Sequence, residues 1–212
     1  MSHLSLVKKL SHLQEEQRHS QEYLEAGNLK LLRGSLTEFT GAQSTGKTSL
    51  AFMLLSTLTQ KGETCAIVDL NNSFNPRAGV NSEIVLENLL WVRCGGNIEH
   101  AFRAADNLIQ AKNFGMIWID LSDHSAKDLN FIPSSYWYRF RTRIKDSQTV
   151  LVITANHPLM GAASNQVYQL EKNKTGWSGD GRFKLVKDLQ VNLNTQKPFF
   201  VKPEVLKIAA RY

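Results

Sequence analysis

The chain has 212 residues, of which 42% are hydrophobic and 21% charged, as in folded globular proteins rather than disordered ones. At about 150 residues per domain, this length predicts one full domain with a small extension. The sequence contains no run of about 18 apolar residues and no secretory signal at its start, so we expect no membrane span. Two cysteines, Cys65 and Cys94, lie in or beside apolar runs, which favours a reducing, cytoplasmic setting.

The net charge of +6 is unevenly distributed along the chain. Residues 131–212 contain 13 Lys and Arg against 5 Asp and Glu, whereas residues 1–130 contain 12 against 14. Such asymmetry indicates a polyanionic partner near the C-terminal part. A basic face that only keeps the protein in solution explains the same count, so charge alone leaves the choice open.

Helices and apolar strands alternate along the chain. An amphipathic helix is predicted over residues 4–26, with Gly27 as its stop; it either covers the sheet or docks a partner. Strands that are apolar throughout are predicted at residues 36–40, 65–70, 89–93, 116–120 and 150–155. Helices are predicted between them at residues 47–61, 98–109 and 134–146. We expect Asn97 to cap the second of these helices.

Apolar strands separated by helices predict an α/β fold, in which a mostly parallel sheet is sandwiched by helices. Near the C-terminus, shorter strands are predicted at residues 167–171, 183–186 and 189–193. The last two alternate between apolar and polar residues, which indicates a small antiparallel C-terminal annex beside the parallel sheet.

Residues 41–48, Gly-Ala-Gln-Ser-Thr-Gly-Lys-Thr, match the G-x-x-x-x-G-K-[ST] pattern of a phosphate-binding loop. A predicted strand precedes the match and a predicted helix follows, as this kind of loop requires. Glycines let successive backbone N–H groups face a phosphate, the helix start adds its positive end, and the lysine and hydroxyl serve the phosphates and Mg²⁺. The candidate nucleotide-binding residues are Gly41, Gln43, Ser44, Thr45, Gly46, Lys47 and Thr48.

A single carboxylate ends the apolar strand over residues 116–120. An acid at the tip of a strand beside a phosphate loop is suited to hold a water bound to Mg²⁺. Thr48 and Asp120 are therefore the candidate metal residues. Asp69 also ends a strand, and for this side chain we expect a role in ordering the following loop or capping a helix.

Residues 36–50 and 62–69 resemble the core of the RecA recombinase family, and Asn75-Pro76 stands where that family has Asp-Pro. Segments 88–93, 114–121 and 149–154 are more similar to ImuA-type proteins, RecA-like accessory factors of bacterial damage-induced mutagenesis. The resemblance implies a RecA-like P-loop NTPase core in which the strand of Asp120 is not adjacent to the phosphate-loop strand. We expect a helical extension over residues 1–30 and a RecA-like nucleotide-binding domain over residues 31–212.

Three positions depart from the recombinase pattern. Recombinases carry a water-activating glutamate where this chain has Asn71, and an amide cannot accept a proton as a carboxylate does. Their γ-phosphate-sensing glutamine corresponds to Asn156, and their adenine-stacking aromatic residue corresponds to Ala78. Lys47, Asn71 and Asn156 are therefore the candidate catalytic residues, and slow hydrolysis is expected. Asn71 is explained equally well as an ordinary loop residue.

The resemblance also suggests where DNA would bind. Recombinases grip single-stranded DNA with two loops, whose counterparts here are residues 122–132 and 157–182. Cations with one exposed aromatic side chain suit backbone neutralisation and base stacking. The candidate DNA-binding residues in the second loop are Lys172, Lys174, Trp177 and Arg182. A basic surface with Trp177 packed into the annex is the alternative.

Three functions follow as hypotheses. The first is an ATP- and Mg²⁺-binding accessory protein of DNA repair or SOS translesion synthesis, with weak or no ATP hydrolysis. Its bound nucleotide would order loops that meet single-stranded DNA, a translesion polymerase or a RecA-type protein. The second is an active, DNA-stimulated, recombinase-like ATPase. The third is a small P-loop kinase that uses Arg139, Arg141 or Arg143 to clamp phosphates.

Overall fold

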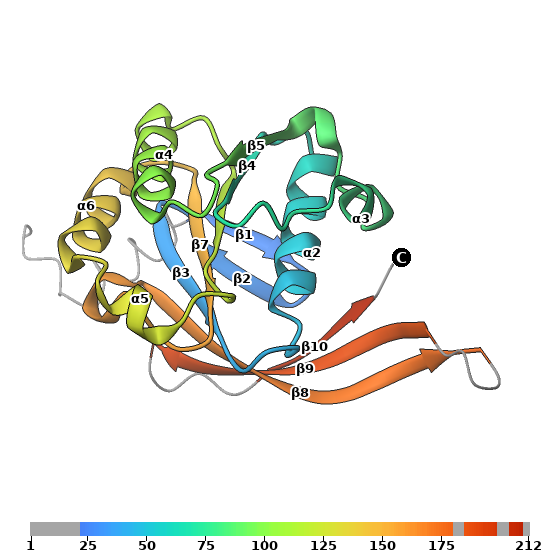
Figure 1. Ribbon diagram of the computed structural model, residues 1–212. Coiled ribbons are helices and arrows are strands. Elements are labelled where there is room, and N and C mark those ends of the chain that lie inside the picture. The colour runs from blue at the N-terminus through green and yellow to red at the C-terminus, as the bar shows by residue number, and fades with distance from the viewer. Residues whose placement is uncertain (1–21, 180–184, 199–203, 210–212) are drawn as a thin grey trace, which may run out of the picture.

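The computed structural model describes residues 22–179, 185–198 and 204–209. Its framework is an eight-stranded sheet with the order β10-β9-β8-β3-β7-β6-β4-β5 (Figure 1). The strands that run parallel are β3 (Ser35–Thr40), β4 (Cys65–Asp69), β5 (Leu89–Arg93), β6 (Met116–Asp120), β7 (Val150–Ala155) and β8 (Gln166–Ser178). The antiparallel strands are β9 (Leu185–Lys197) and β10 (Glu204–Ala209). The predicted fold class is therefore confirmed.

Helices cover both faces of the sheet (Figure 1). The helices are α2 (Lys47–Gln60), α3 (Pro76–Asn81), α4 (Ile98–Ala111), α5 (Ala126–Asn130) and α6 (Ser134–Ile144). Successive side chains of the central strands point to opposite faces, as strand geometry demands. In β6, Met116 and Trp118 join the core beneath α2, whereas Ile117 and Ile119 join the core beneath α4 and α6. The central strands β3, β4, β6 and β7 are thus buried on both sides, whereas the edge strand β5 is partly exposed.

Most predicted elements lie where the sequence indicated. The bounds of β5, β6 and β7 coincide with the predicted strands, and the side chain of Asn97 accepts a hydrogen bond from His100 N at the start of α4. The strand of Asp120 is separated from the phosphate-loop strand β3 by β7, as the family resemblance implied. The strand positions therefore agree with the apolar pattern of the sequence, and the strand order agrees with the family resemblance.

The helix predicted over residues 4–26 is wrong at its end. Tyr23–Ala26 form strand β1, which pairs with β2 (Leu29–Leu32) as an antiparallel hairpin. Exposed and buried residues alternate along β1, a strand period, and the hairpin packs into the core beneath α2. The hairpin crosses the boundary expected at residue 30. Residues 1–21 lie outside the described part of the chain, so a helix there stays a prediction.

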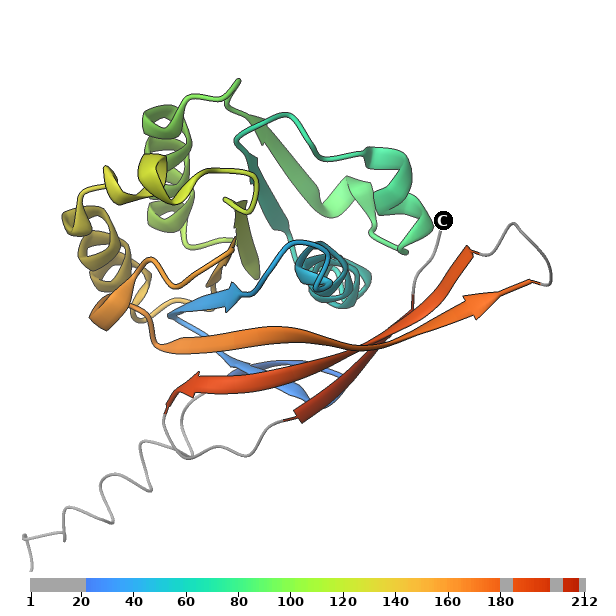
Figure 2. The same cartoon turned by 60° about the horizontal axis from the view of Figure 1, so that its bottom comes forward.

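The C-terminal strands are larger than the predicted annex and belong to the main sheet, because β8 pairs with β3 in parallel. The strands predicted at residues 183–186 and 189–193 are one strand, β9, within the described residues. A register shift leaves Lys187 without a partner on β8, which explains the break in the pattern. Figure 2 shows the far halves of β8 and β9 passing beside the start of α2. None of the described helices has the length and apolar character needed to span a bilayer.

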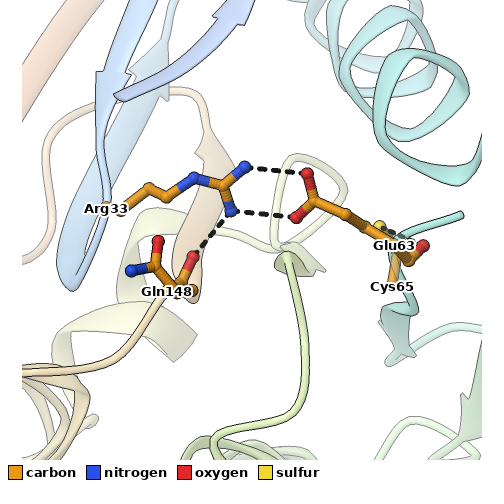
Figure 3. Close-up of polar contacts among 4 residues, drawn as sticks. All are labelled: Arg33, Glu63, Cys65 and Gln148. Carbon is orange, nitrogen blue, oxygen red and sulfur yellow. Dashed lines mark hydrogen bonds and ion pairs between the residues drawn. The ribbon is translucent and has the colours of Figure 1, made fainter. Parts of the chain in front are cut away.

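A polar clamp ties the connections at the amino ends of the parallel strands (Figure 3). Arg33 donates two hydrogen bonds to the Glu63 carboxylate, at 2.8 and 2.9 Å, and one to Gln148 O at 2.9 Å. Gly115 precedes β6 at the same place, and a Cβ there would lie 2.3 Å from Glu63 Oε2. The clamp holds the segments before β3, β4, β6 and β7 together at one edge of the sheet.

Candidate functional site

A cavity of about 650 Å³ opens at the carboxyl ends of the parallel strands, the edge opposite the Arg33 clamp. In open α/β sheets this edge is where ligands bind. The walls come from the phosphate loop and α2, from the segments after β4 and β6, and from the far halves of β8 and β9. Most of the predicted nucleotide-binding residues line it: Gln43, Ser44, Thr45, Gly46, Lys47 and Thr48.

The phosphate loop curls tightly, and the uncapped N-terminus of α2 lies at the cavity. Gly46 has φ of 93° and is the N-cap of α2, and no side chain caps the first-turn N–H groups. These groups carry the positive end of a 14-residue helix. A Cβ at Gly46 would lie 2.5 Å from Leu189 Cδ2, and one at Gly41 would lie 2.5 Å from Leu170 O. The backbone of β8 therefore requires glycine at position 41, whereas glycine at position 46 is favoured mainly by its positive φ.

Lys47 places its ammonium inside this curl. Lys47 Nζ donates to Gly41 O at 2.6 Å, to Ala42 O at 2.8 Å and to Asn156 Oδ1 at 3.2 Å. Burial lowers the pKa of Lys47, and the nearby charges of Asp120 and Asp123 oppose that shift. A cation in this position is suited to an anionic ligand.

Asp120 is fixed by a chain of buried hydrogen bonds. Its Oδ1 accepts from Thr154 Oγ1 at 2.8 Å and from Ser122 N at 2.9 Å. The Thr154 oxygen in turn accepts from Trp118 Nε1 at 3.0 Å, so the hydroxyl hydrogen is directed to the carboxylate. Trp118 and Thr154 are buried and were not among the predicted site residues. They hold the carboxylate of Asp120 at the cavity wall.

The residues present fit a phosphate with a hard cation. Thr48 and Asp120 both line the cavity, and each offers oxygen, the ligand atom that Mg²⁺ prefers. Ser122 and Thr175 also line the cavity, and their hydroxyl oxygens are buried without a hydrogen-bond partner among the described residues. No group of three or more His, Cys, Asp or Glu side chains clusters as a metal site within residues 22–179, 185–198 and 204–209. Mg²⁺ typically shares such a site with substrate phosphates rather than using an all-protein cage.

Asn156 and Asn71 differ in their surroundings. Asn156 lies just after β7, accepts from Lys47 and donates from Nδ2 to Ser122 O at 2.8 Å, so it links the phosphate loop to the segment after β6. Asn71 is exposed and is not part of the cavity lining. The neighbouring Asp69 orders its loop, as expected, by accepting from Ser73 N at 2.9 Å and Phe74 N at 3.1 Å.

The segment after β7 is anchored to the phosphate-loop strand. Glu38 on β3 is 1% exposed, and its Oε1 accepts from Leu159 N at 3.0 Å and Met160 N at 2.5 Å. Among the described residues its Oε2 has no partner, and burial raises the pKa of the carboxyl group. Glu38 therefore stabilises this segment at the cost of a buried carboxylate.

The predicted DNA-binding residues separate in space. Lys172 and Trp177 line the cavity, together with Thr175, whereas Lys174 is exposed and outside the lining. Arg182 lies outside the described residues. Two of the predicted DNA-binding residues are thus neighbours of the phosphate loop, a position that sequence spacing did not indicate.

Helix α6, which carries Arg139, Arg141 and Arg143, lies on the far face of the sheet from α2 (Figure 1). Arg139 and Arg143 pair with Asp106, at 3.4 and 2.5 Å, and Arg141 donates to Ala162 O at 2.6 Å. These arginines do not belong to the cavity lining. The phosphate clamp that a small kinase needs is therefore not supplied by these side chains.

Comparison with known proteins agrees with this geometry. Residues 22–126 match the family described as RecA N-terminal domain. The chain is 30% identical over 90 residues to a mitochondrial DNA repair protein recA homolog of Dictyostelium discoideum, 31% over 88 to Protein RecA of Rickettsia africae, and 33% over 90 to Protein RecA of Rhodospirillum rubrum. Each match covers 42% of this chain but only 20–25% of the relative. The chain thus carries a RecA-like domain, and its similarity to RecA proteins is distant and partial.

Proposed function

We propose that this protein binds ATP with Mg²⁺ and acts as a RecA-like accessory factor in DNA repair or damage-induced translesion synthesis, with slow or no hydrolysis. The observation that carries the proposal is the cavity at the carboxyl ends of the strands, where Lys47 and an uncapped helix start face Asp120. The similarity to RecA proteins supports the DNA-repair setting.

In this proposal each residue has a separate task. The first-turn N–H groups of α2 and the ammonium of Lys47 bind the phosphates, and the loop glycines allow the close approach. Thr48 and Asp120 would hold Mg²⁺, which when bound neutralises phosphate charge. Asn156 would respond to the terminal phosphate, since it contacts both Lys47 and Ser122 O. Binding or loss of the terminal phosphate would thereby alter the conformation of the segments after β6 and β7.

Slow hydrolysis is supported by the chemistry of one position. The family resemblance assigns the water-activating carboxylate to residue 71, which is an exposed asparagine. An amide cannot accept the proton of the attacking water, so this contribution to catalysis would be missing. In such a protein, nucleotide binding would change the conformation of the loops, and the energy of hydrolysis would not be needed.

Nucleotide binding is tested by calorimetric titration of ATP, with and without Mg²⁺, into the wild type, Lys47→Ala and Lys61→Ala. Lys61 is the matched control, because it is an exposed lysine just after the other end of the same helix. We expect Lys47→Ala to weaken binding at least tenfold and Lys61→Ala to leave it unchanged. Equal affinities for all three proteins would refute nucleotide binding at this loop.

The accessory role is tested by phosphate release with and without single-stranded DNA. We expect slow release that DNA does not stimulate, and an increase in release when Asn71→Glu supplies a carboxylate. Many-fold stimulation by DNA in the wild type would instead support the recombinase-like ATPase. Direct DNA binding by Lys172, Lys174, Trp177 and Arg182 stays a prediction, as do the polymerase and RecA-type partners.

A further inference from the structure

The cavity has a second wall that the phosphate loop does not supply. It is formed by the far half of β8, from which Lys172, Thr175 and Trp177 line the cavity opposite α2. This half extends past the start of α2, beside the phosphate loop (Figure 2). Leu189 on the paired strand β9 lies against Gly46, which brings the wall and the loop into direct contact.

A β-bulge sets which side chains of β8 face the cavity. In the pairing with β9, Lys172 opposes Val191 and Lys174 opposes Gln190, so Asn173 is the extra residue. Strict alternation would place Lys172, Lys174 and Gly176 on one face. The extra residue shifts the alternation by one, so that Thr175 and Trp177 follow Lys172 on the cavity side.

Trp177 is suited to hold a flat apolar group. It is 56% exposed, whereas Trp118 and Trp137 are each 3% exposed and Trp91 is half-buried. An exposed indole at the rim of a cavity offers a face on which an aromatic ring can stack. The neighbouring Thr175 hydroxyl has no hydrogen-bond partner among the described residues, although it is buried. A ligand that reached this wall would meet a stacking surface.

Three other aromatic side chains line the cavity, namely Phe52, Phe74 and Trp118. They pack edge to face against one another in the core beneath α2, and each is less exposed than Trp177. The family resemblance assigns the base-stacking aromatic residue to position 78, which is alanine and does not line the cavity. We propose that Trp177 takes the base of the bound nucleotide by stacking, with Lys172 adding positive charge between the base and the phosphate loop. This inference rests on the proposed nucleotide binding, and it assigns to the nucleotide an indole that would otherwise be available to DNA.

The test compares ATP with inorganic tripolyphosphate, which has the phosphates but no base. Trp177→Ala should weaken ATP binding about 5- to 150-fold, the range of one base–aromatic stack, and change tripolyphosphate binding less than about twofold. Trp177→Phe keeps a ring and should retain most of the affinity. Tyr138→Ala, an exposed aromatic residue on α6, is the matched control and should bind ATP as the wild type does.

A spectroscopic readout protects the test against misfolding of the alanine variant. ATP should quench indole emission in the wild type, and Trp177→Phe should lose most of this quenching while still binding ATP. If wild type and Trp177→Ala bind ATP equally, or if Trp177→Ala loses only single-stranded DNA binding, the inference is overturned. If neither ATP nor tripolyphosphate binds the wild type, the proposed function itself fails, which is a different result.

Discussion

Replacing Thr154 by valine tests whether Asp120 is held by the buried chain of hydrogen bonds. Valine has nearly the same shape but removes the hydroxyl that links Trp118 Nε1 to Asp120 Oδ1. A hydrogen bond to a charged group contributes about 1.5–3 kcal/mol, and a buried indole N–H left unpaired costs about 1–3 kcal/mol. Because these losses overlap, we expect the free energy of unfolding to fall by about 2–4 kcal/mol.

Urea unfolding of the wild type, Thr154→Val and Thr154→Ser measures this loss. Serine keeps the hydroxyl and loses one buried methyl group, so its cost should be about 1 kcal/mol. In an Asp120→Asn background the penalty of Thr154→Val should shrink, because the charged acceptor is gone. Equal stabilities of the valine and serine variants would show that the hydroxyl does not hold Asp120.

Three further variants test other contacts. Glu38→Gln should remove a pH dependence of the free energy of unfolding, because burial raises the pKa of Glu38 above its ordinary 4.5. The wild type should therefore lose stability relative to the variant as pH rises from 4.5 through the raised pKa, and urea-unfolding profiles that stay parallel would contradict this. Arg33→Lys should lower the free energy of unfolding by about 1–2 kcal/mol, because lysine cannot make the paired hydrogen bonds to Glu63. Titrations should show an unchanged ATP affinity, because the cavity lies at the opposite edge of the sheet. Gly46→Ala should lower the melting temperature, because the positive φ costs an alanine about 1–2 kcal/mol and because its Cβ would contact Leu189. Adding Leu189→Ala should restore part of the melting temperature, and no restoration would argue against that contact.

The sequence predicts the sheet well where local patterns are sufficient. β6 is an apolar run that ends on Asp120, β7 is an apolar run that ends before Asn156, and the bounds of both were predicted correctly. The phosphate loop is local as well, since its residues lie within one turn and one helix start. The strand pair after residue 22 was missed because Tyr23 and Leu24 fit a helical pattern equally well, and only packing beneath α2 decides between the two.

The rest of the site depends on contacts between distant segments. Trp118, Thr154 and Asp120 meet because β6 and β7 are neighbours, and no pattern within either strand indicates that contact. Lys172 and Trp177 could be identified as a cation and an aromatic residue, but their orientation depends on an extra residue in the pairing of β8 with β9. Side-chain direction along a strand follows register, and register is set by the partner strand.

The extra residue Asn173 has an evolutionary consequence. Asn173 lies in the β8–β9 pair, far from the phosphate loop in sequence, and its side chain donates to Asn192 Oδ1 on β9 at 2.9 Å. Loss of that bulge without loss of a residue would rotate Trp177 outward and Lys174 inward in a single step, leaving residues 41–48 untouched. Descendants of this fold could therefore exchange an aromatic lining for a cationic one, and so change the preferred ligand, without rebuilding the machinery that captures phosphate.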